Sequence, residues 1–230
     1  MLLYCFPHAG GADSPYRSWG DRLASVEVRV LGRGARFPGT APRTPDSVPA
    51  LAEACADHLA AERRPYLFLG HSLGALVAFE TARALRARGG RGPAVLFATG
   101  HVAPHLPSPG RKLAGLPTAE FWTEVCALGG TPPELLDHAA LREAAEPGLR
   151  AEFRAAETYR YTPGRPLDCR IVAMTGTDDD RAPADQCAAW RLHTTGSFDL
   201  HTVPGGHFFV ADDPEPVLDR IREETASPVR

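Results

Sequence analysis

The sequence predicts a single α/β domain, spanning residues 1–230, with a mostly parallel central sheet, helices on both faces of the sheet and a helical lid insertion. Three observations lead to this expectation. Short apolar segments of strand length alternate with longer helical segments along most of the chain. A length of 230 residues and an apolar fraction of 43% suit one well-buried core. The strand pattern is interrupted once, between residues 104 and 166.

Six segments are expected to form strands, because each is a short run that is largely apolar or alternates apolar with polar residues: 2–6, 26–31, 66–70, 95–99, 170–175 and 198–203. Helices are expected at 48–62 and 75–88, the second closed by two glycines. In the first helix, an apolar stripe at helical spacing is predicted to be packed: Leu51, Ala54, Cys55, His58 and Leu59.

The segment 104–166 is predicted to contain only short helices, at about 119–128, 133–145 and 149–159, broken by Pro and Gly. A strand-free segment of this length is too long for an ordinary connection between two strands. We therefore expect it to form a lid over the ends of the strands.

Composition and charge exclude several classes of protein. The net charge of -3 is mild and the basic residues are scattered, which argues against a nucleic-acid-binding surface. No apolar run approaches the ~20 residues needed to cross a bilayer, and no signal-peptide pattern opens the sequence. The cysteines lack C-x-x-C spacing, so we expect neither disulfides nor a zinc site. The expectation is a soluble, cytoplasmic monomer that binds neither membrane nor nucleic acid.

Residues 70–74 read Gly-His-Ser-Leu-Gly, between a strand candidate and a helix candidate. This context is typical of the nucleophile elbow of α/β-hydrolases, in which the serine occupies a strained turn. Strand and helix crowd together there, so the positions two before and two after Ser72 must lack side chains, as Gly70 and Gly74 do. A Gly-rich turn with an incidental serine is the alternative. The flanking elements favour Ser72 as a nucleophile.

Two backbone amides are candidates for stabilising the oxyanion of an acyl-transfer intermediate. The amide of Leu73 follows the nucleophile at the start of a helix. A second donor is expected from the loop after the first strand, where residues 6–11 read Phe-Pro-His-Ala-Gly-Gly, and we assign the amide of Ala9. An ordinary turn would explain the two glycines equally well.

The acid and the histidine follow the nucleophile in that order along the chain of an α/β-hydrolase. His207 lies beyond the last strand candidate, in a loop that reads Pro-Gly-Gly-His-Phe-Phe at 204–209, and is assigned as the general base. His193 and His201 are interpreted as surface or packing residues. For His8 and His71, a role in shaping the site is favoured over proton transfer.

The acid is expected in the loop after the strand at 170–175, which reads Gly-Thr-Asp-Asp-Asp at 176–180. Asp179 is favoured, because the spacing G-x-x-D matches a turn that directs a carboxylate toward the histidine loop. Asp178 and Asp180 are interpreted as capping or solvated residues. The acid orients the imidazole and stabilises the imidazolium without accepting its proton.

With these residues, the chain resembles the stand-alone type II thioesterases that accompany modular polyketide and nonribosomal peptide synthases. The resemblance covers nearly the whole chain and is carried by Cys-Phe-Pro-His-Ala-Gly-Gly at 5–11, the elbow at 70–74, Leu-Gly-Gly-Thr-Pro at 128–132, and the stretch from 194–196 through 204–209. In that family the acid lies three residues after the glycine that ends the strand, a position that Asp179 occupies here.

The resemblance implies hydrolysis of acyl groups from the phosphopantetheine arm of an acyl or peptidyl carrier protein, often to remove aberrant units. It implies no metal or other cofactor, since the partner carries the substrate. A general carboxylesterase or an acyltransferase would use the same three residues. A non-catalytic carrier-protein-binding protein would keep only the fold, and the presence of Ser72, the aspartates at 178–180 and His207 weighs against it.

Apolar residues of the expected lid are candidates for lining the acyl channel: Phe121, Trp122 and Val125, together with Leu135 and Leu136. Packing of the lid on the sheet is the alternative interpretation for most of them.

Overall fold

The computed structural model describes residues 1–11, 14–32, 47–130 and 137–226. Its strands form one sheet in the order β2-β1-β3-β4-β5-β6, and every pairing between neighbours is parallel. The strands are β1 (Leu2–Phe6), β2 (Glu27–Val30), β3 (Tyr66–His71), β4 (Val95–Thr99), β5 (Arg170–Gly176) and β6 (Phe198–Val203). The predicted α/β-hydrolase fold class is confirmed, and each predicted strand is present with its ends within a residue of the prediction.

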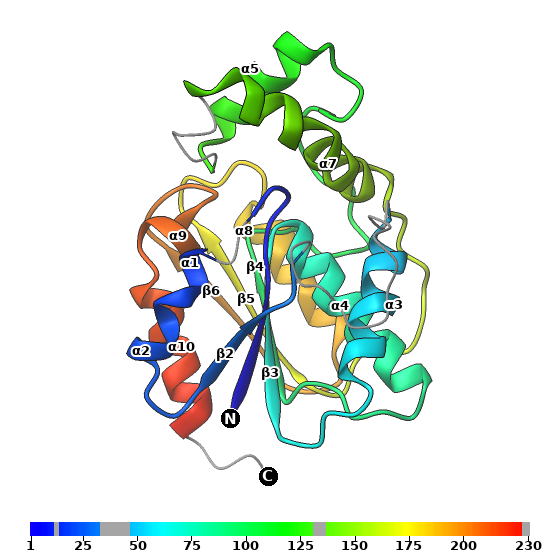
Figure 1. Ribbon diagram of the computed structural model, residues 1–230. Helices are drawn as coiled ribbons and strands as arrows, with labels where there is room; N and C mark the ends of the chain where they lie inside the picture. The colour runs from blue at the N-terminus through cyan, green and yellow to red at the C-terminus, as the bar shows by residue number, and fades with distance from the viewer. Residues whose placement is uncertain (12–13, 33–46, 131–136, 227–230) are drawn as a thin grey trace.

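The helices in the described ranges lie on both faces of this sheet and above its carboxyl edge (Figure 1). They are α1 (Ser14–Arg17), α2 (Trp19–Arg22), α3 (Val48–Leu59), α4 (Leu73–Ala87), α5 (Thr118–Leu128), α7 (Ala139–Thr158), α8 (Ala184–Ala188), the 3-10 helix η1 (Ala189–His193), α9 (Phe209–Asp212) and α10 (Glu215–Ala226). No helix within the described ranges is both long enough and apolar enough to cross a membrane.

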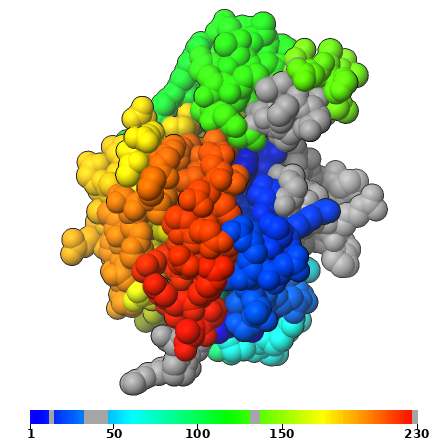
Figure 2. Space-filling model, turned by 90° about the vertical axis from the view of Figure 1, so that its left-hand side faces the viewer, coloured from blue at the N-terminus to red at the C-terminus, as the bar shows by residue number. Residues whose placement is uncertain are grey.

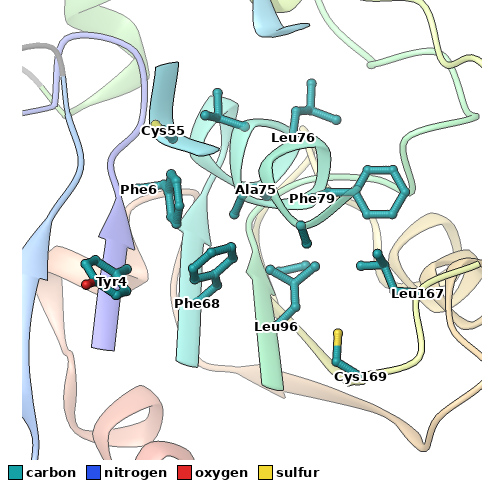
Figure 3. Packing of buried hydrophobic residues seen from close by; sticks show 14 of the residues in the cluster. Tyr4, Phe6, Cys55, Phe68, Ala75, Leu76, Phe79, Leu96, Leu167 and Cys169 are labelled. Atoms are coloured by element: carbon teal, nitrogen blue, oxygen red, sulfur yellow. The ribbon is translucent and has the colours of Figure 1, made fainter. Parts of the chain in front are cut away.

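Strand β1 shows why the sheet is covered on both sides. All five of its residues are buried, as expected for a parallel strand with helices on each face. Leu2, Tyr4 and Phe6 point into a cluster with residues of α3 and α4, which Figure 3 shows in part. Leu3 and Cys5 point into a second cluster, formed with α1, α2, α9 and α10. The sheet is therefore the middle of three layers.

The helix α3 differs from the prediction in which residues it buries. Its buried residues are Val48, Ala52, Cys55, Ala56 and Leu59, whereas His58 is exposed. The buried face is rotated around the helix axis from the predicted stripe, since Ala52 and Ala56 are buried whereas Leu51 and Ala54 are only half-buried. His58 is thus exposed rather than buried as predicted.

Helices α5 and α7 lie between β4 and β5 in the sequence and above the carboxyl ends of the strands in space (Figure 1). The space-filling view shows this part of the chain as the green projection at the top of the molecule (Figure 2). The two helices share a small apolar cluster that includes Phe121, Val125, Leu149 and Phe153.

We predicted a break between 145 and 149, but α7 is continuous from Ala139 to Thr158 and contains Pro147. Proline removes the hydrogen bond to the carbonyl four residues earlier. That carbonyl belongs to Glu143, which is exposed like Pro147, so water can replace the lost donor. Part of the predicted helix at 133–145, with Leu135 and Leu136, lies outside the described residues.

The sheet order places the candidate site. From β1 the chain crosses to β2 on one side, and it returns through α3 to β3 on the other side of β1. The connections after β1 and β3 therefore leave the sheet in opposite directions, and such a switch point opens a crevice at the carboxyl ends of the strands. The loop at 7–11 and Ser72 both lie at this crevice.

Candidate active site

The turn at Ser72 has the strained geometry expected of a nucleophile elbow. Ser72 has φ 55° and ψ -120°. Among the residues that the structure describes, every other residue with a positive φ is a glycine. A Cβ atom at Gly70 would lie 2.3 Å from the carbonyl oxygen of Gly74, and one at Gly74 would lie 1.9 Å from the carbonyl oxygen of Phe6. Both glycines are therefore required by close backbone contacts, the second because β1 passes directly against the start of α4.

The structure brings together the three side chains predicted to act in catalysis. The Nε2 atom of His207 lies 3.1 Å from Ser72 Oγ, and its Nδ1 atom lies 2.8 Å from Asp179 Oδ2. A carboxylate only accepts hydrogen bonds, so Nδ1 carries the proton and Nε2 is left to accept that of Ser72. The side chain of Asp179 is 0% exposed, whereas its neighbours Asp178 and Asp180 are exposed.

Backbone hydrogen bonds hold the loop that carries Asp179 against the loop that carries His207. The amide of Thr177 donates to the carbonyl of Val203 at 2.8 Å, and that of Asp178 donates to the carbonyl of Gly205 at 3.0 Å. The Oδ1 atom of Asp179 accepts from the amide of Arg181 at 3.0 Å. Because β5 and β6 are neighbouring strands, these contacts fix the distance from acid to histidine through the sheet itself.

Three further imidazoles lie close to the site. Burial, and then the nearby charge of protonated His207, lowers the pKa of His8 to about 4. The pKa of His71 is lowered for the same two reasons, and burial lowers that of His101 to about 4. These side chains are neutral near pH 7, and none of them contacts both a carboxylate and Ser72 in the described structure. The geometry thus favours His207 for proton transfer and leaves His8 and His71 as shaping residues.

Two cavities meet at Ser72. The first, which we call the apolar cavity, has a volume of about 420 Å³ and extends from Ser72 and Ala9 along apolar residues of α5 and α7: Val125, Leu128, Ala144, Ala145, Leu149 and Phe153. The second, which we call the basic cavity, has a volume of about 460 Å³ and reaches from Ser72 and Leu73 to several cations: Arg111, Lys112, Arg160 and Arg181. Ala9, Ser72 and His207 line both cavities.

The candidate oxyanion residues lie where these cavities join. Ala9 lines both cavities beside Ser72, and Leu73 begins the 15-residue helix α4, whose N-terminal amides carry partial positive charge. The roles of these amides stay predictions. The two residues come from the ends of β1 and β3, which the sheet order makes neighbours.

The predicted channel residues are separated by the structure. Val125 lines the apolar cavity. Phe121 is 0% exposed and contacts Phe153 edge to face, so it packs the α5 and α7 helices together and does not line either cavity described here. Trp122 faces a groove on the outside of these helices, where its Nε1 donates to Glu146. The alternative interpretation, packing of the lid, therefore suits Phe121 and Trp122, because the apolar face of α5 is wide enough to pack against a helix as well as to line a cavity.

Two charged residues of the cavities were not predicted. Arg181 lines both of them, and burial lowers the pKa of its guanidinium without removing its charge. Glu152 lines the apolar cavity and is only 8% exposed. The sequence signal for Glu152 is weak, consisting of an acid between Leu149 and Phe153 on the apolar face of a helix. In the part of the chain that the structure describes, no cluster of three or more His, Cys, Asp or Glu residues suits a metal ion.

The fold and the residues at its switch point define a serine hydrolase of the α/β-hydrolase class. Comparison with known proteins narrows this class. The family model of the thioesterase domain matches residues 2–225. The chain belongs to the thioesterase family.

The relatives include thioesterases, one of them from a named biosynthetic cluster. Thioesterase PikA5 of Streptomyces venezuelae is 36% identical over 230 residues, which is 97% of this chain and 80% of that protein. The type II thioesterase BorB of the borrelidin biosynthetic cluster has a structure that superposes with a TM-score of 0.84 at 34% identity, covering 100% of this chain and 92% of BorB. The linear gramicidin dehydrogenase LgrE of Brevibacillus parabrevis is 40% identical over 237 residues, or 99% of this chain and 88% of LgrE. Its name does not transfer, because this sequence contains no G-x-G-x-x-G fingerprint for a dinucleotide.

Proposed function

We propose that this protein is a stand-alone editing thioesterase. It hydrolyses acyl thioesters on the phosphopantetheine arm of acyl or peptidyl carrier proteins and removes aberrant units from a polyketide or nonribosomal peptide synthase. The observation that carries the proposal is the hydrogen-bonded series from Ser72 through His207 to Asp179 at the junction of two cavities. The five cysteines are all free, which suits the reducing cytoplasm.

The reaction proceeds in two halves. Ser72 Oγ attacks the thioester carbonyl while His207 Nε2 takes its proton, and the amides of Ala9 and Leu73 donate to the resulting oxyanion. The C–S bond then breaks, His207 protonates the departing thiol, and an acyl-serine remains. In the second half His207 takes a proton from water, which attacks the acyl-serine carbonyl. The ester C–O bond then breaks, His207 returns the proton to Ser72 Oγ, and the free acid leaves. These steps transfer no electrons to or from a cofactor, and imidazole activates both nucleophiles, so the proposed reaction uses no metal or redox cofactor.

The chemistry of the two cavities suits the two ends of such a substrate. Among the described residues that line the basic cavity, the cations outnumber the one carboxylate, Glu157, and a phosphate on the pantetheine arm would be attracted to Lys112 and Arg160. Hydrocarbon side chains dominate the apolar cavity, which suits the acyl chain. We therefore assign the arm to the basic cavity and the acyl group to the apolar cavity, with the thioester at Ser72. The protein is one α/β-hydrolase domain in this proposal, and residues 104–166 form its lid.

Intact-protein mass spectrometry of a panel of acyl carrier proteins tests the proposal. Incubation with the enzyme should remove the mass of the acyl group and leave the phosphopantetheine thiol free. Ser72→Ala should lose this activity by several orders of magnitude while still binding the carrier. Retention of more than about a tenth of the activity would remove Ser72 from the nucleophile role. Acyl transfer to an added thiol or amine would instead identify an acyltransferase, and faster cleavage of nitrophenyl esters than of acyl-pantetheine would identify a carboxylesterase.

A further inference from the structure

Helix α7 of the proposed lid is hydrogen-bonded to, and packed against, the loop at 8–11, which carries the candidate oxyanion amide of Ala9. The amide of Gly10 donates to Glu152 Oε2 at 2.6 Å, and Glu152 is 8% exposed. One turn earlier on α7, the Leu149 side chain occupies the space beside Gly10, since a Cβ atom there would lie 2.6 Å from Leu149 Cδ1. Ala9 itself packs against the apolar cluster of α5 and α7.

The loop at 8–11 has the features of a type II turn. The amide of Gly11 donates to the carbonyl of His8 at 2.8 Å, and Gly10 has φ +75°, the value that the third residue of such a turn requires. The carbonyl of His8 and the amide of Ala9 belong to one planar peptide group, so the bond to Gly11 also orients the Ala9 amide.

The peptide group between Ala9 and Gly10 is the one that distinguishes turn types. It is reversed between type I and type II turns, whose other peptide groups are similar. In the type II form the amide of Gly10 points at Glu152. The His8–Ala9 peptide keeps its direction in either form, so the hydrogen bond from Gly10 to Glu152 acts on the turn as a unit. It anchors the turn to α7 one residue from Ala9, and this anchor sets where the Ala9 amide lies relative to Ser72.

We propose that Glu152 is a positioning residue for hydrolysis: its carboxylate holds the Gly10 amide, and through it the turn that presents the Ala9 amide to the oxyanion. This inference rests on the proposed function, because it gives Ala9 the role of an oxyanion donor. It adds that the oxyanion hole is complete only while α7 is seated on the loop. Closure of the lid and assembly of the hole are then a single event.

Variants at position 152 separate the hydrogen bond from packing and charge. Glu152→Gln retains an oxygen that accepts from Gly10, so kcat should stay within about threefold of the wild type. Glu152→Asp keeps the charge but withdraws it by one methylene, and Glu152→Ala removes the acceptor. Loss of one oxyanion donor costs about 10² to 10³ in kcat, so misalignment in these two variants should cost about 10- to 100-fold. The loss should fall on kcat more than on KM, because the oxyanion that the Ala9 amide stabilises forms only in the transition state. Glu143→Ala, at an exposed position of the same helix, is the matched control.

Rates should be expressed per active site, titrated with a fluorophosphonate, so that a variant that merely folds poorly is not mistaken for one with a misaligned loop. A boronic acid that forms a tetrahedral adduct with Ser72 should bind Glu152→Ala more weakly by the same factor by which kcat falls. A kcat per active site within twofold of the wild type in both Glu152→Ala and Glu152→Asp would overturn the inference. Equal loss in Glu152→Gln and Glu152→Ala would also overturn it. If Glu152→Ala does not fold, the comparison of Asp with Gln decides the matter.

This outcome is distinguishable from failure of the proposed function. The boronic acid affinity and the hydrolysis of a small acyl-pantetheine report on the oxyanion hole without a carrier protein. If the wild type cleaves the small thioester but no acyl carrier protein, the proposed function fails while the Glu152 series still yields its result.

Discussion

Replacement of Asp179 by asparagine tests the catalytic triad, because an amide cannot accept both of the hydrogen bonds that the carboxylate accepts. Each oxygen of the carboxylate has a donor, since Oδ1 accepts from the Arg181 amide at 3.0 Å and Oδ2 accepts from His207 Nδ1 at 2.8 Å. Asparagine offers one acceptor and one donor group in the same place. The side chain is fully buried, so water cannot satisfy the group that loses its partner.

Neither orientation of the amide is suitable. If its oxygen faces Arg181, its NH₂ group faces Nδ1 and moves the imidazole proton to Nε2, which then donates to Ser72 and cannot accept its proton. If its oxygen faces His207, two donors meet at Arg181, and a buried unsatisfied donor costs about 1 to 3 kcal/mol. We expect kcat to fall by about 10³ to 10⁴, as when a triad acid no longer sets the imidazole tautomer. That loss corresponds to about 4 to 5.5 kcal/mol in the barrier.

The assay is single-turnover hydrolysis of acyl-pantetheine, with urea unfolding to confirm that each variant is folded. Asp178→Asn and Asp180→Asn are matched controls at exposed neighbouring positions and should stay within a few fold of the wild type. If Asp178→Asn proved the most damaging change, or Asp179→Asn kept more than a tenth of the activity, the assignment of the acid would be refuted.

Three further predictions concern the acyl cavity, the elbow and the buried imidazoles. Val125→Trp should lower kcat/KM for long acyl chains at least ten-fold more than for acetyl or propionyl carriers, since one methylene in an apolar pocket is worth about 1 to 3 kcal/mol; an equal loss across chain lengths would mean that Val125 only packs the lid. Gly74→Ala places a Cβ atom 1.9 Å from the Phe6 oxygen, so we expect a loss of more than about 4 kcal/mol in the free energy of unfolding, measured by urea titration, and a variant as stable as the wild type would contradict the close approach. Burial lowers the pKa of His101 and His193 to about 4 in the folded protein, whereas the unfolded chain binds these protons below about pH 6.5. The unfolding free energy should therefore fall as the pH decreases from about 6.5 to 4, and His193→Gln should make that fall shallower; an unchanged pH dependence in His193→Gln would show that this imidazole is protonated in the fold.

Features that depend on neighbouring residues could be predicted from the sequence. The strands at 2–6, 95–99 and 198–203 have the predicted bounds. The first two are buried apolar runs, and the third alternates apolar with polar residues on the half-exposed edge strand. The elbow is similarly local, since Gly70 and Gly74 are separated only by the turn that they make possible. Chain order and spacing placed His207 and Asp179 in loops that the structure joins, although each lies far along the chain from Ser72.

Contacts between distant segments could not be predicted. Glu152 and Gly10 are 142 positions apart, and no spacing rule connects a lid helix to a loop after the first strand. The sequence could not divide the apolar face of α5 between cavity and helix packing, which is why Val125 lines the cavity while Phe121 is enclosed. Proline at 147 was expected to end a helix, but its effect depends on whether water reaches one carbonyl, and that is a property of the folded surface.

The backbone bonds between the Asp179 and His207 loops have a consequence for engineering. The loops that carry Asp179 and His207 are hydrogen-bonded to each other at the ends of two adjacent strands, whereas the proposed oxyanion loop is held partly by α7. A chimaera that exchanges residues 104–166 for the equivalent segment of another thioesterase would leave the catalytic triad intact. On the Glu152 proposal, its oxyanion hole would form only if the grafted segment supplies a hydrogen-bond acceptor opposite the Gly10 amide. Segments for grafting can therefore be chosen first by whether they carry an acceptor for the Gly10 amide, and only then by the shape of their acyl cavity. This order would separate grafts that alter chain-length preference from grafts that abolish turnover.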